Sequence, residues 1–236
     1  MRIDLRTVVL VTTPSDERSN TMRIGILGAG GMADALGTQW FRAGHEVMIS
    51  GRDPVRATAS AARMTGAAGV SHGAVLTGTW AEAAAFGDVV MAAVREAGLR
   101  DVLTAAGPAL RGKPLIDVTN SATPDSYDPV RPIARMAADI TGAHVVKAFN
   151  LGHVDVWRMT PPVFGGRPLA VPLCGDDPEA VEKVRGLVAE LGCTPLDGGG
   201  LARATLLEAT AAFVIGLWFG GADAQAILTP LEHAGA

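Results

Sequence analysis

The sequence has few aromatic residues and few cysteines: 5% of its 236 residues are aromatic, and Cys174 and Cys193 are its two cysteines. They form no C-x-x-C pair, and two cysteines cannot build the framework of a disulfide-rich secreted domain. The net charge is −4 and the basic residues are dispersed, so the charge pattern does not attract a phosphate backbone. We therefore predict a cytoplasmic protein that does not bind nucleic acid.

Long hydrophobic runs and metal-ligand patterns are also missing. The most apolar stretch, residues 201–219, is interrupted by Arg203 and Glu208. A membrane span needs about 20 mainly apolar residues with few charges, so we predict a helix buried against a sheet or a second subunit, and no membrane contact. The five histidines show no H-E-x-x-H spacing, and no metal site is predicted.

The leading segment, residues 1–21, is expected to be a flexible extension. Its apolar stretch at 8–11 is too short for a signal-peptide core, and residues 14–20 are polar or charged. We expect the fold to begin at Met22, and our hypothesis is that Met22 is the natural start. The alternative is an added edge strand over residues 7–12.

The rest of the chain has a soluble globular composition, with 48% hydrophobic and 19% charged residues. Short apolar strands alternate with helical segments, which predicts an α/β fold with a Rossmann-type, doubly wound parallel sheet. Strands are expected over residues 22–27, 46–50, 88–94, 114–118 and 144–150. In this architecture ligands bind outside the carboxyl ends of the strands.

A glycine-rich turn follows the first strand and opens a helix that reaches about Arg42. The turn has the G-x-G-x-x-A pattern and consists of Gly28, Ala29, Gly30, Gly31, Met32 and Ala33. The first glycine permits a tight turn, the second lets the backbone approach a pyrophosphate, and Ala33 lets helix and strand pack closely. Because strand, motif, helix and next strand arrive in order, we predict dinucleotide binding at the helix N-terminus.

The second strand ends in Ser50-Gly51-Arg52, without the acidic residue that would bind the ribose 2′-hydroxyl of NAD. A guanidinium can stack on adenine and pair with a phosphate, so Arg52 favours the 2′-phosphate of NADP. The alternative is a solvated arginine in a turn before Pro54. Asp53 is expected to face water.

Two further strand ends should border the cofactor. Ala93, Val94 and Arg95 follow one strand, and Asn120 follows the next. Asn120 is either a hydrogen-bonding partner for ribose or carboxamide or a plain turn residue. Arg95 is either a cofactor contact or a surface charge near a helix.

The strand at 144–150 ends in Lys147-Ala148-Phe149-Asn150. Together with the glycine-rich turn, Arg52 and the Asp117-Val118-Thr119-Asn120 segment, it resembles the NADPH-dependent reductases of the 8-hydroxy-5-deazaflavin coenzyme F-420. It is equally similar to the soluble flavin-reducing domain of the six-transmembrane metalloreductases. The resemblance covers residues 22 to about 218.

The resemblance implies hydride transfer between NADP(H) and a deazaflavin or flavin acceptor, either coenzyme F-420 or FMN/FAD. It divides the chain into an NADP-binding domain, residues 22–150, and a small C-terminal α/β domain, residues 151–236, for acceptor binding and dimerisation. It places the Ala148-Phe149-Asn150 turn near the nicotinamide. The surplus of apolar surface at 201–219 favours a homodimer.

The chain departs from the family at two points. Relatives often read Gly-Ser-Arg where this chain has Ser50-Gly51-Arg52, which weakens the phosphate role of the hydroxyl. Many have Thr after Ala-Phe-Asn, where this chain continues Leu151-Gly152-His153. His153 is either a loop histidine or a proton donor, since its ordinary pKa of about 6.5 lies near neutrality.

Two other functions are consistent with the pattern. An NADPH-dependent reductase of a small imine or enone would need a proton donor, for which His153 is the candidate. A sensor that binds NADPH without turnover would keep the glycine turn and Arg52 and close the acceptor site. Direct hydride transfer needs no nucleophile, which fits the lack of an acid–base pair in the motifs.

Overall fold

The computed structural model describes residues 21–71, 73–227 and 233. The predictions for residues 1–20, including the alternative edge strand, lie outside these residues. The first strand begins at Arg23, directly after Met22.

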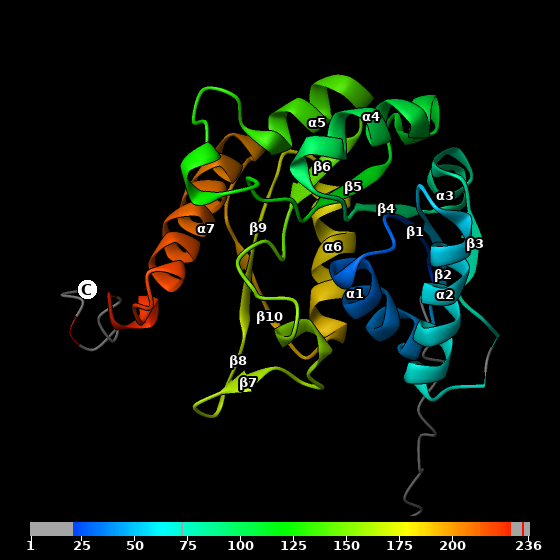
Figure 1. Ribbon diagram of the computed structural model, residues 1–236, viewed down its shortest axis with the longest axis horizontal. Helices are drawn as coiled ribbons and strands as arrows, with labels where there is room; N and C mark the ends of the chain where they lie inside the picture. Colours follow the sequence, from blue (N-terminus) through cyan, green and yellow to red (C-terminus); the bar gives the residue numbers. More distant parts are fainter. Residues whose placement is uncertain (1–20, 72, 228–232, 234–236) are drawn as a thin grey trace, which may run out of the picture.

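One eight-stranded sheet forms the centre of the molecule, in the order β10-β9-β6-β5-β4-β1-β2-β3 (Figure 1). The strands are β1 Arg23–Leu27, β2 Glu46–Ser50, β3 Leu76–Gly78, β4 Val89–Ala92, β5 Pro114–Asp117, β6 His144–Lys147, β9 Ala170–Gly175 and β10 Thr194–Asp197. The six strands from β1 to β6 pair in parallel, which confirms the doubly wound sheet.

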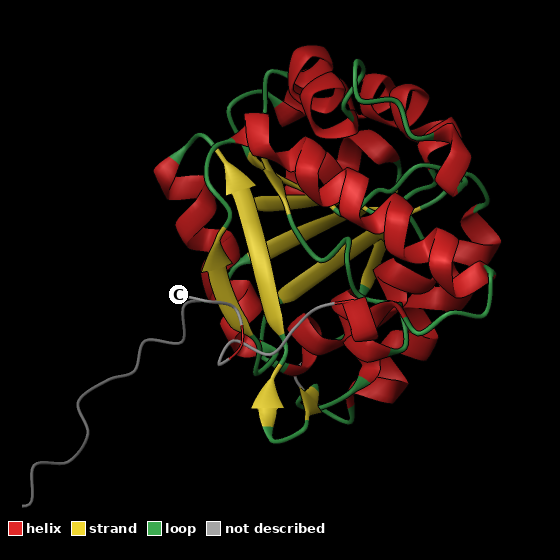
Figure 2. Ribbon diagram, turned by 90° about the vertical axis from the view of Figure 1, so that its left-hand side faces the viewer, coloured by secondary structure: helices red, strands yellow, loops and turns green. Residues whose placement is uncertain are grey.

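Helices cover both faces of this sheet (Figures 1 and 2). One buried cluster joins the sheet to α1 Gly31–Arg42, α2 Pro54–Ala68 and α6 Pro178–Glu190. The other joins it to α3 Trp80–Phe86, α4 Glu96–Ala106, α5 Ile133–Thr141 and the start of α7 Ala204–Phe219. Strand β1 shows the alternation that this requires, because Ile24 and Ile26 belong to the first cluster and Leu27 to the second.

The C-terminal part extends the same sheet. Strand β9 pairs antiparallel with β6, and β10 pairs parallel with β9. The described residues from 151 onward therefore add strands, α6 and α7 to the edge of the sheet. They belong to the segment for which the resemblance implied a small C-terminal α/β domain. A small hairpin, β7 Val163–Phe164 and β8 Arg167–Pro168, projects from one end of the molecule (Figure 2).

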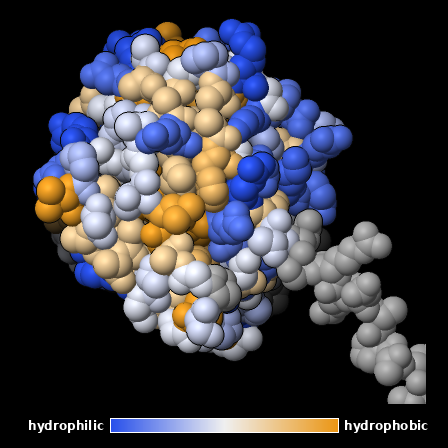
Figure 3. Space-filling view, turned by 90° about the vertical axis from the view of Figure 1, so that its right-hand side faces the viewer, coloured by the Kyte–Doolittle hydropathy of each residue, from blue (hydrophilic) through white to orange (hydrophobic). Residues whose placement is uncertain are grey.

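The opposite edge of the sheet is the three-residue strand β3. Figure 3 shows that side of the molecule, where hydrophilic side chains gather around the rim and apolar ones lie toward the middle. Leu76 of β3 is 45% exposed and is the large apolar side chain that this edge presents. The edge is short, which limits the unpaired backbone that a further strand could join.

Polar groups at helix ends explain several boundaries. Asp53 accepts hydrogen bonds from two backbone N–H groups in the first turn of α2, and Thr79 and Glu82 form a capping box at α3. At the other end of α3, Lys113 Nζ donates to the carbonyl oxygens of Ala84, Ala85 and Gly87 at 2.7–3.0 Å. These caps fix where α2 and α3 begin and where α3 ends.

Helix α7 is the most apolar helix and is poorly covered. Residues 201–219 are long and apolar enough to cross a membrane by length and composition alone, and 28% of that stretch is buried. Core helices of soluble proteins meet the same criterion. The predicted helix is confirmed, and its predicted burial is confirmed in its first part, where Ala204, Glu208 and Ala211 are buried.

Candidate functional site

The glycine-rich turn lies where β1, β4 and α1 meet. Gly28 has φ +146°, and a Cβ atom there would lie 2.3 Å from the carbonyl oxygen of Ala93, so glycine is required. At Gly30, by contrast, a Cβ atom would meet nothing within 4 Å. Gly30 is the N-cap of α1, and no side chain caps the N-terminus of that helix. This geometry suits a pyrophosphate, as the motif predicted.

A groove of about 1020 Å³ starts at this turn and runs between the end of β2 and helix α4. Eight of the predicted cofactor residues line it: Gly28, Ala29, Gly30, Gly51, Arg52, Ala93, Val94 and Arg95. Arg56, Trp80 and one face of α4, including Gly98 and Asp101, also line it. The groove is large enough for the adenosine and phosphate part of a dinucleotide.

Two arginines, Arg52 and Arg56, line the groove. Arg52 lies in the bend before α2 and Arg56 in the first turn of α2. Both are exposed, and within the described part of the chain neither side chain has an ion pair or hydrogen bond. The nearest carboxylate in sequence, Asp53, is occupied as the N-cap of α2. Both guanidinium groups are thus free to bind a phosphate. Arg56 was not among the predicted cofactor residues, and its place in the first turn of the helix that follows Arg52 was the available signal.

Ser50 requires a correction. Its side chain is fully buried, and its hydroxyl donates to the carbonyl oxygen of Ile26 at 2.9 Å. Ser50 was predicted to lie near the 2′-phosphate with a weakened role for its hydroxyl, and the structure turns that hydroxyl away from the groove. It links two neighbouring parallel strands, and Arg52 and Arg56 remain for the phosphate.

Three other predicted residues belong to the turn but do not line the groove. Ala33 is fully buried under the start of α1, as close packing requires. Met32 packs against the same cluster. Gly31 faces the loop after β6, because a Cβ atom there would lie 3.2 Å from Val154 Cγ2.

The carboxyl ends of β5 and β6 are joined by a pair of amides. Asn120 Nδ2 donates to the backbone oxygen of Asn150 at 2.7 Å, and Asn150 Nδ2 donates to Asn120 Oδ1 at 3.0 Å. Asn150 Nδ2 also donates to the backbone oxygen of Leu207 in α7. Asn120 and Asn150 are 30 residues apart in the sequence and lie together in the fold. Helix α7 contacts them at the edge of the sheet where the carboxyl ends of the strands lie.

A buried charge cluster lies behind this pair. Lys147 Nζ donates to Asp117 Oδ2 at 2.9 Å and to the backbone oxygen of Thr119, and it lies 3.4 Å from Glu208 Oε1. Asp117 and Lys147 are fully buried, and Glu208 is 2% exposed. Neither Lys147 nor Glu208 was among the residues predicted to form the site. A charged residue inside an apolar helix was the available signal for Glu208.

Two local features at this edge are energetically unfavourable. Phe149 has φ +61°, which is unusual for a residue other than glycine. Among the described residues, Thr119 Oγ1 is the one buried side-chain N or O atom without a hydrogen-bond partner. Such features persist where the surrounding structure holds them, and they cluster at functional sites.

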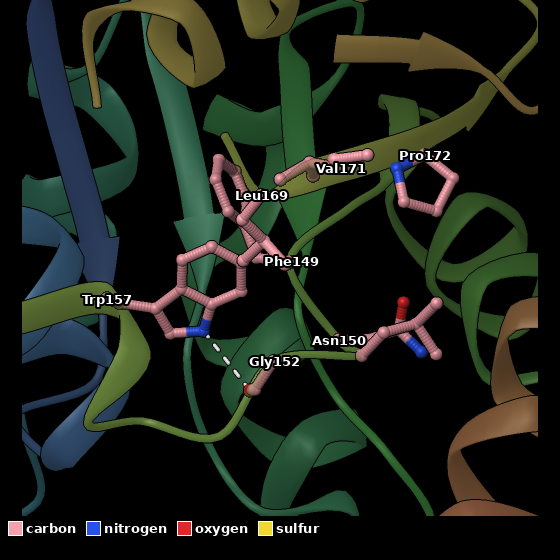
Figure 4. A pocket seen from close by; sticks show the side chains of 9 residues that line it. Phe149, Asn150, Gly152, Trp157, Leu169, Val171 and Pro172 are labelled. Atoms are coloured by element: carbon pink, nitrogen blue, oxygen red, sulfur yellow. Dashed lines mark hydrogen bonds between the residues drawn. The ribbon is translucent and has the colours of Figure 1, made fainter. Parts of the chain in front are cut away.

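Aromatic side chains fix the turn after β6. The Phe149 ring makes edge-on contacts with Trp40 at 5.9 Å and with Trp157 at 5.3 Å. The Trp157 indole N–H donates to the carbonyl oxygen of Gly152 (Figure 4). Ala148 is fully buried below this turn. The indole leaves no room for a side chain at Gly152, where a Cβ atom would lie 2.2 Å from it.

A second, smaller cavity of about 60 Å³ lies beside Asn150 (Figure 4). Its walls come from the turn after β6 and from the start of β9, and none of the residues that line it is ionisable: Phe149, Asn150, Leu151, Gly152, Trp157, Leu169, Ala170, Val171 and Pro172. His153 lies outside both cavities. Its side chain is 66% exposed, with Nδ1 3.4 Å from Asp155 Oδ2.

Comparison with known proteins shows which families this chain resembles. Residues 23–121, which contain the glycine turn, Arg52, Arg95 and Asn120, match the family model described as NADP oxidoreductase, coenzyme F-420-dependent. The match covers the domain that carries the groove, which is thus similar to NADP-dependent oxidoreductases of this family. The open space at Gly30 and the free guanidinium groups of Arg52 and Arg56 agree with that similarity.

Similar proteins extend the comparison beyond this domain. The chain is 30% identical over 198 residues to the metalloreductase STEAP3 of Rattus norvegicus, a match that covers 83% of this chain and 38% of that protein. The structure of this chain resembles that of a putative F-420-dependent NADP reductase from an Arthrobacter species, with a TM-score of 0.71 and 26% identity. The match covers 85% of this chain and 96% of that one.

An imine reductase from a Pseudomonas species shares the fold at 20% identity, with a TM-score of 0.60, and the match covers 86% of this chain and 63% of that one. This likeness concerns the fold alone. The F-420-dependent NADP reductase matches along nearly its whole length, as the sequence resemblance predicted.

Proposed function

We propose that this protein is an oxidoreductase that transfers a hydride between NADP(H) and a tricyclic deazaflavin or flavin acceptor. The observation that carries the proposal is the Asn120–Asn150 pair, which lies at the carboxyl ends of β5 and β6, where this fold binds the reactive end of a nucleotide. In the reducing direction the hydride leaves nicotinamide C4 with both electrons and adds to the central ring of the acceptor. The acceptor then takes one proton from solvent.

Positioning supplies most of the catalysis in this reaction. Direct hydride transfer needs the donor and acceptor atoms about 3–3.5 Å apart and aligned, and it needs no nucleophile. The amides of Asn120 and Asn150 offer donors and acceptors that can orient a carboxamide or a pyrimidine edge. The neighbouring cavity, with its apolar and uncharged lining, suits the edge of an aromatic ring.

The alternative functions receive less support from the geometry. A small imine or enone would need a proton donor beside the nicotinamide, and the candidate, His153, lies in an exposed loop outside both cavities. A sensor without turnover would need a closed acceptor side. Both remain outcomes of the test.

The test is anaerobic mixing of the protein with NADPH and, separately, coenzyme F-420, FMN and FAD, with the visible absorbance of each acceptor recorded. We expect NADPH-dependent bleaching of at least one acceptor, lost in Arg52→Ala at low NADPH concentration. Tight NADPH binding without reduction of any tricyclic acceptor would overturn the proposal. Imines and enones would then be tested as acceptors.

A second copy of the chain is proposed to cover α7. Its side chains include Leu206, Phe213 and Phe219, which are 51%, 59% and 81% exposed. An apolar area of this kind on a helix that begins at the acceptor site indicates a partner surface. Light scattering at micromolar concentration should give the mass of a dimer, and Phe213→Glu should give a monomer. A monomeric wild type, or binding to neutral lipid vesicles, would contradict this.

A further inference from the structure

The cluster of Asp117, Lys147 and Glu208 is an arrangement that NADP binding does not explain. We propose that Lys147 and Glu208 are positioning residues, which hold the start of α7 in register with the Asn120–Asn150 pair and thereby align acceptor and nicotinamide. This inference rests on the proposed hydride transfer. It concerns residues that touch neither cofactor nor acceptor.

Each charged group in the cluster has polar partners. The three N–H groups of Lys147 have three oxygen partners, from Asp117, Thr119 and Glu208. Asp117 Oδ1 accepts the backbone N–H of Thr119 at 2.9 Å. Glu208 accepts the backbone N–H groups of Ile133 and Ala134, both at 3.0 Å, at the start of α5. The helix dipole of α5 there favours the extra negative charge of the cluster.

Stability alone does not account for such a cluster. Burying charged groups carries a desolvation cost, and well-packed apolar residues are often as stable or more so. A buried ionic cluster does specify one arrangement, because a shifted helix would leave a charge unpaired. The cluster is therefore suited to fixing the position of α7.

The cluster and the amide pair connect the same elements at adjacent residues. In α7, Leu207 accepts the hydrogen bond of Asn150, and the next residue, Glu208, contacts Lys147. In β5 and its extension, Thr119 accepts the hydrogen bond of Lys147, and the next residue is Asn120. A movement of Glu208 therefore displaces the Leu207 carbonyl and, with it, the Asn150 amide.

The loop before α5 adds a further tie to α7. Tyr127 Oη lies 2.8 Å from Thr205 Oγ1 and 3.1 Å from the backbone oxygen of Thr205. Glu208 in turn binds the start of α5. These two contacts join the first turns of α7 to the loop before α5 and to the start of α5. The start of α7 is thus held from two sides, whereas its far end is exposed.

The test uses Glu208→Gln, which keeps the shape of the side chain and removes its charge. We expect NADPH affinity to change less than twofold, because the groove is untouched, and the rate constant of hydride transfer to fall on the order of 10–100-fold, as small misplacements do. Glu208→Asp, which keeps the charge on a shorter side chain, should show a smaller loss of the same kind. The matched control is Asp177→Ala, which removes the cap of α6 beside the start of β6. It should lower the melting temperature and leave the rate unchanged.

A second readout does not need turnover. The side-chain amide signals of Asn120 and Asn150, assigned by Asn→Asp variants, should shift in the nitrogen–proton NMR spectrum of Glu208→Gln and stay in place in Asp177→Ala. A lower melting temperature with unchanged amide signals and unchanged hydride transfer would reduce the cluster to a structural role. If the wild type reduces no tricyclic acceptor, the proposed function fails, and the amide signals still decide whether Glu208 positions the pair.

Discussion

The side-chain amide of Asn150 donates to Asn120 Oδ1 at 3.0 Å and so joins the carboxyl ends of β5 and β6. The same amide nitrogen reaches the carbonyl oxygen of Leu207, so the C-terminal helix meets the nucleotide-binding sheet at this point. A groove with two free arginines lies on one side of the edge, and a small uncharged cavity lies on the other. In the proposed function, a dinucleotide in the groove and a flat acceptor beside the small cavity would meet at this edge.

Arg52 and Arg56 should determine the preference for NADPH. We expect Arg52→Ala and Arg56→Ala each to raise the KM for NADPH by roughly 10-fold or more, since a hydrogen bond to a charged group contributes about 1.5–3 kcal/mol. The KM for NADH should change far less. The control is Arg63→Ala, which lies on the same helix as Arg56 and donates to Ser60, and it should leave both KM values unchanged. Equal effects on both cofactors would contradict the assignment.

Gly28 and Gly30 should respond differently to the same substitution. Gly28→Ala introduces a side chain at φ +146° and against Ala93, so the melting temperature should fall by several degrees. Gly30→Ala meets open space and should fold normally, while its methyl group intrudes on the pyrophosphate site and weakens NADPH binding. Thermal unfolding with and without NADPH measures both. A normal NADPH affinity in Gly30→Ala would place the pyrophosphate elsewhere.

Lys113 should stabilise the fold without affecting the site. Its ammonium group binds three carbonyl oxygens at the end of α3, and burial lowers its pKa. Lys113→Met leaves those carbonyls without a partner, and we expect a loss on the order of 1–3 kcal/mol in the free energy of unfolding. Urea unfolding measures it. Hydride transfer in the folded variant should equal that of the wild type, and a change there would link α3 to catalysis.

The two cysteines should be unreactive in the native protein. Burial raises the pKa of Cys193 to about 11 and also raises the pKa of Cys174. Ellman's reagent at pH 8 should therefore label neither thiol until the chain is unfolded, because the thiolate is the reactive form. Since the folded state keeps its protons to higher pH than the unfolded state, these groups should lower stability as the pH rises from about 9 toward 11. Rapid labelling of native protein at pH 8 would contradict this.

Features that depend on local sequence could be predicted. The G-x-G-x-x-A turn, the strands around it and the position of Arg52 follow from residues that are close in the chain, and the structure confirms the strands and the groove contact of Arg52. Ser50 shows the limit of this reasoning. Its type and place suited phosphate binding, but the alternation of β2 turns its hydroxyl toward Ile26.

Features that depend on distant contacts could not be predicted. The antiparallel pairing of β9 with β6 is set by packing that no local pattern records. The fold brings Lys147 to Asp117, 30 residues before it, and to Glu208, 61 residues after it. Nothing in the sequence near any one of them indicates this contact. The short elements β3 and α3 and the helix α5 were missed, since β3 and α3 are only three and seven residues long.

The central claim is direct hydride transfer from NADPH to a tricyclic acceptor, and isotope transfer tests it most directly. NADPH carrying deuterium on one face of nicotinamide C4 would be mixed anaerobically with the protein and coenzyme F-420, and the reduced acceptor analysed by mass spectrometry. We predict that deuterium from one face alone appears at the central ring carbon of the deazaflavin. Oxidation of NADPH by coenzyme F-420 with no deuterium in the acceptor, or no oxidation of NADPH by coenzyme F-420, FMN or FAD, would contradict the account.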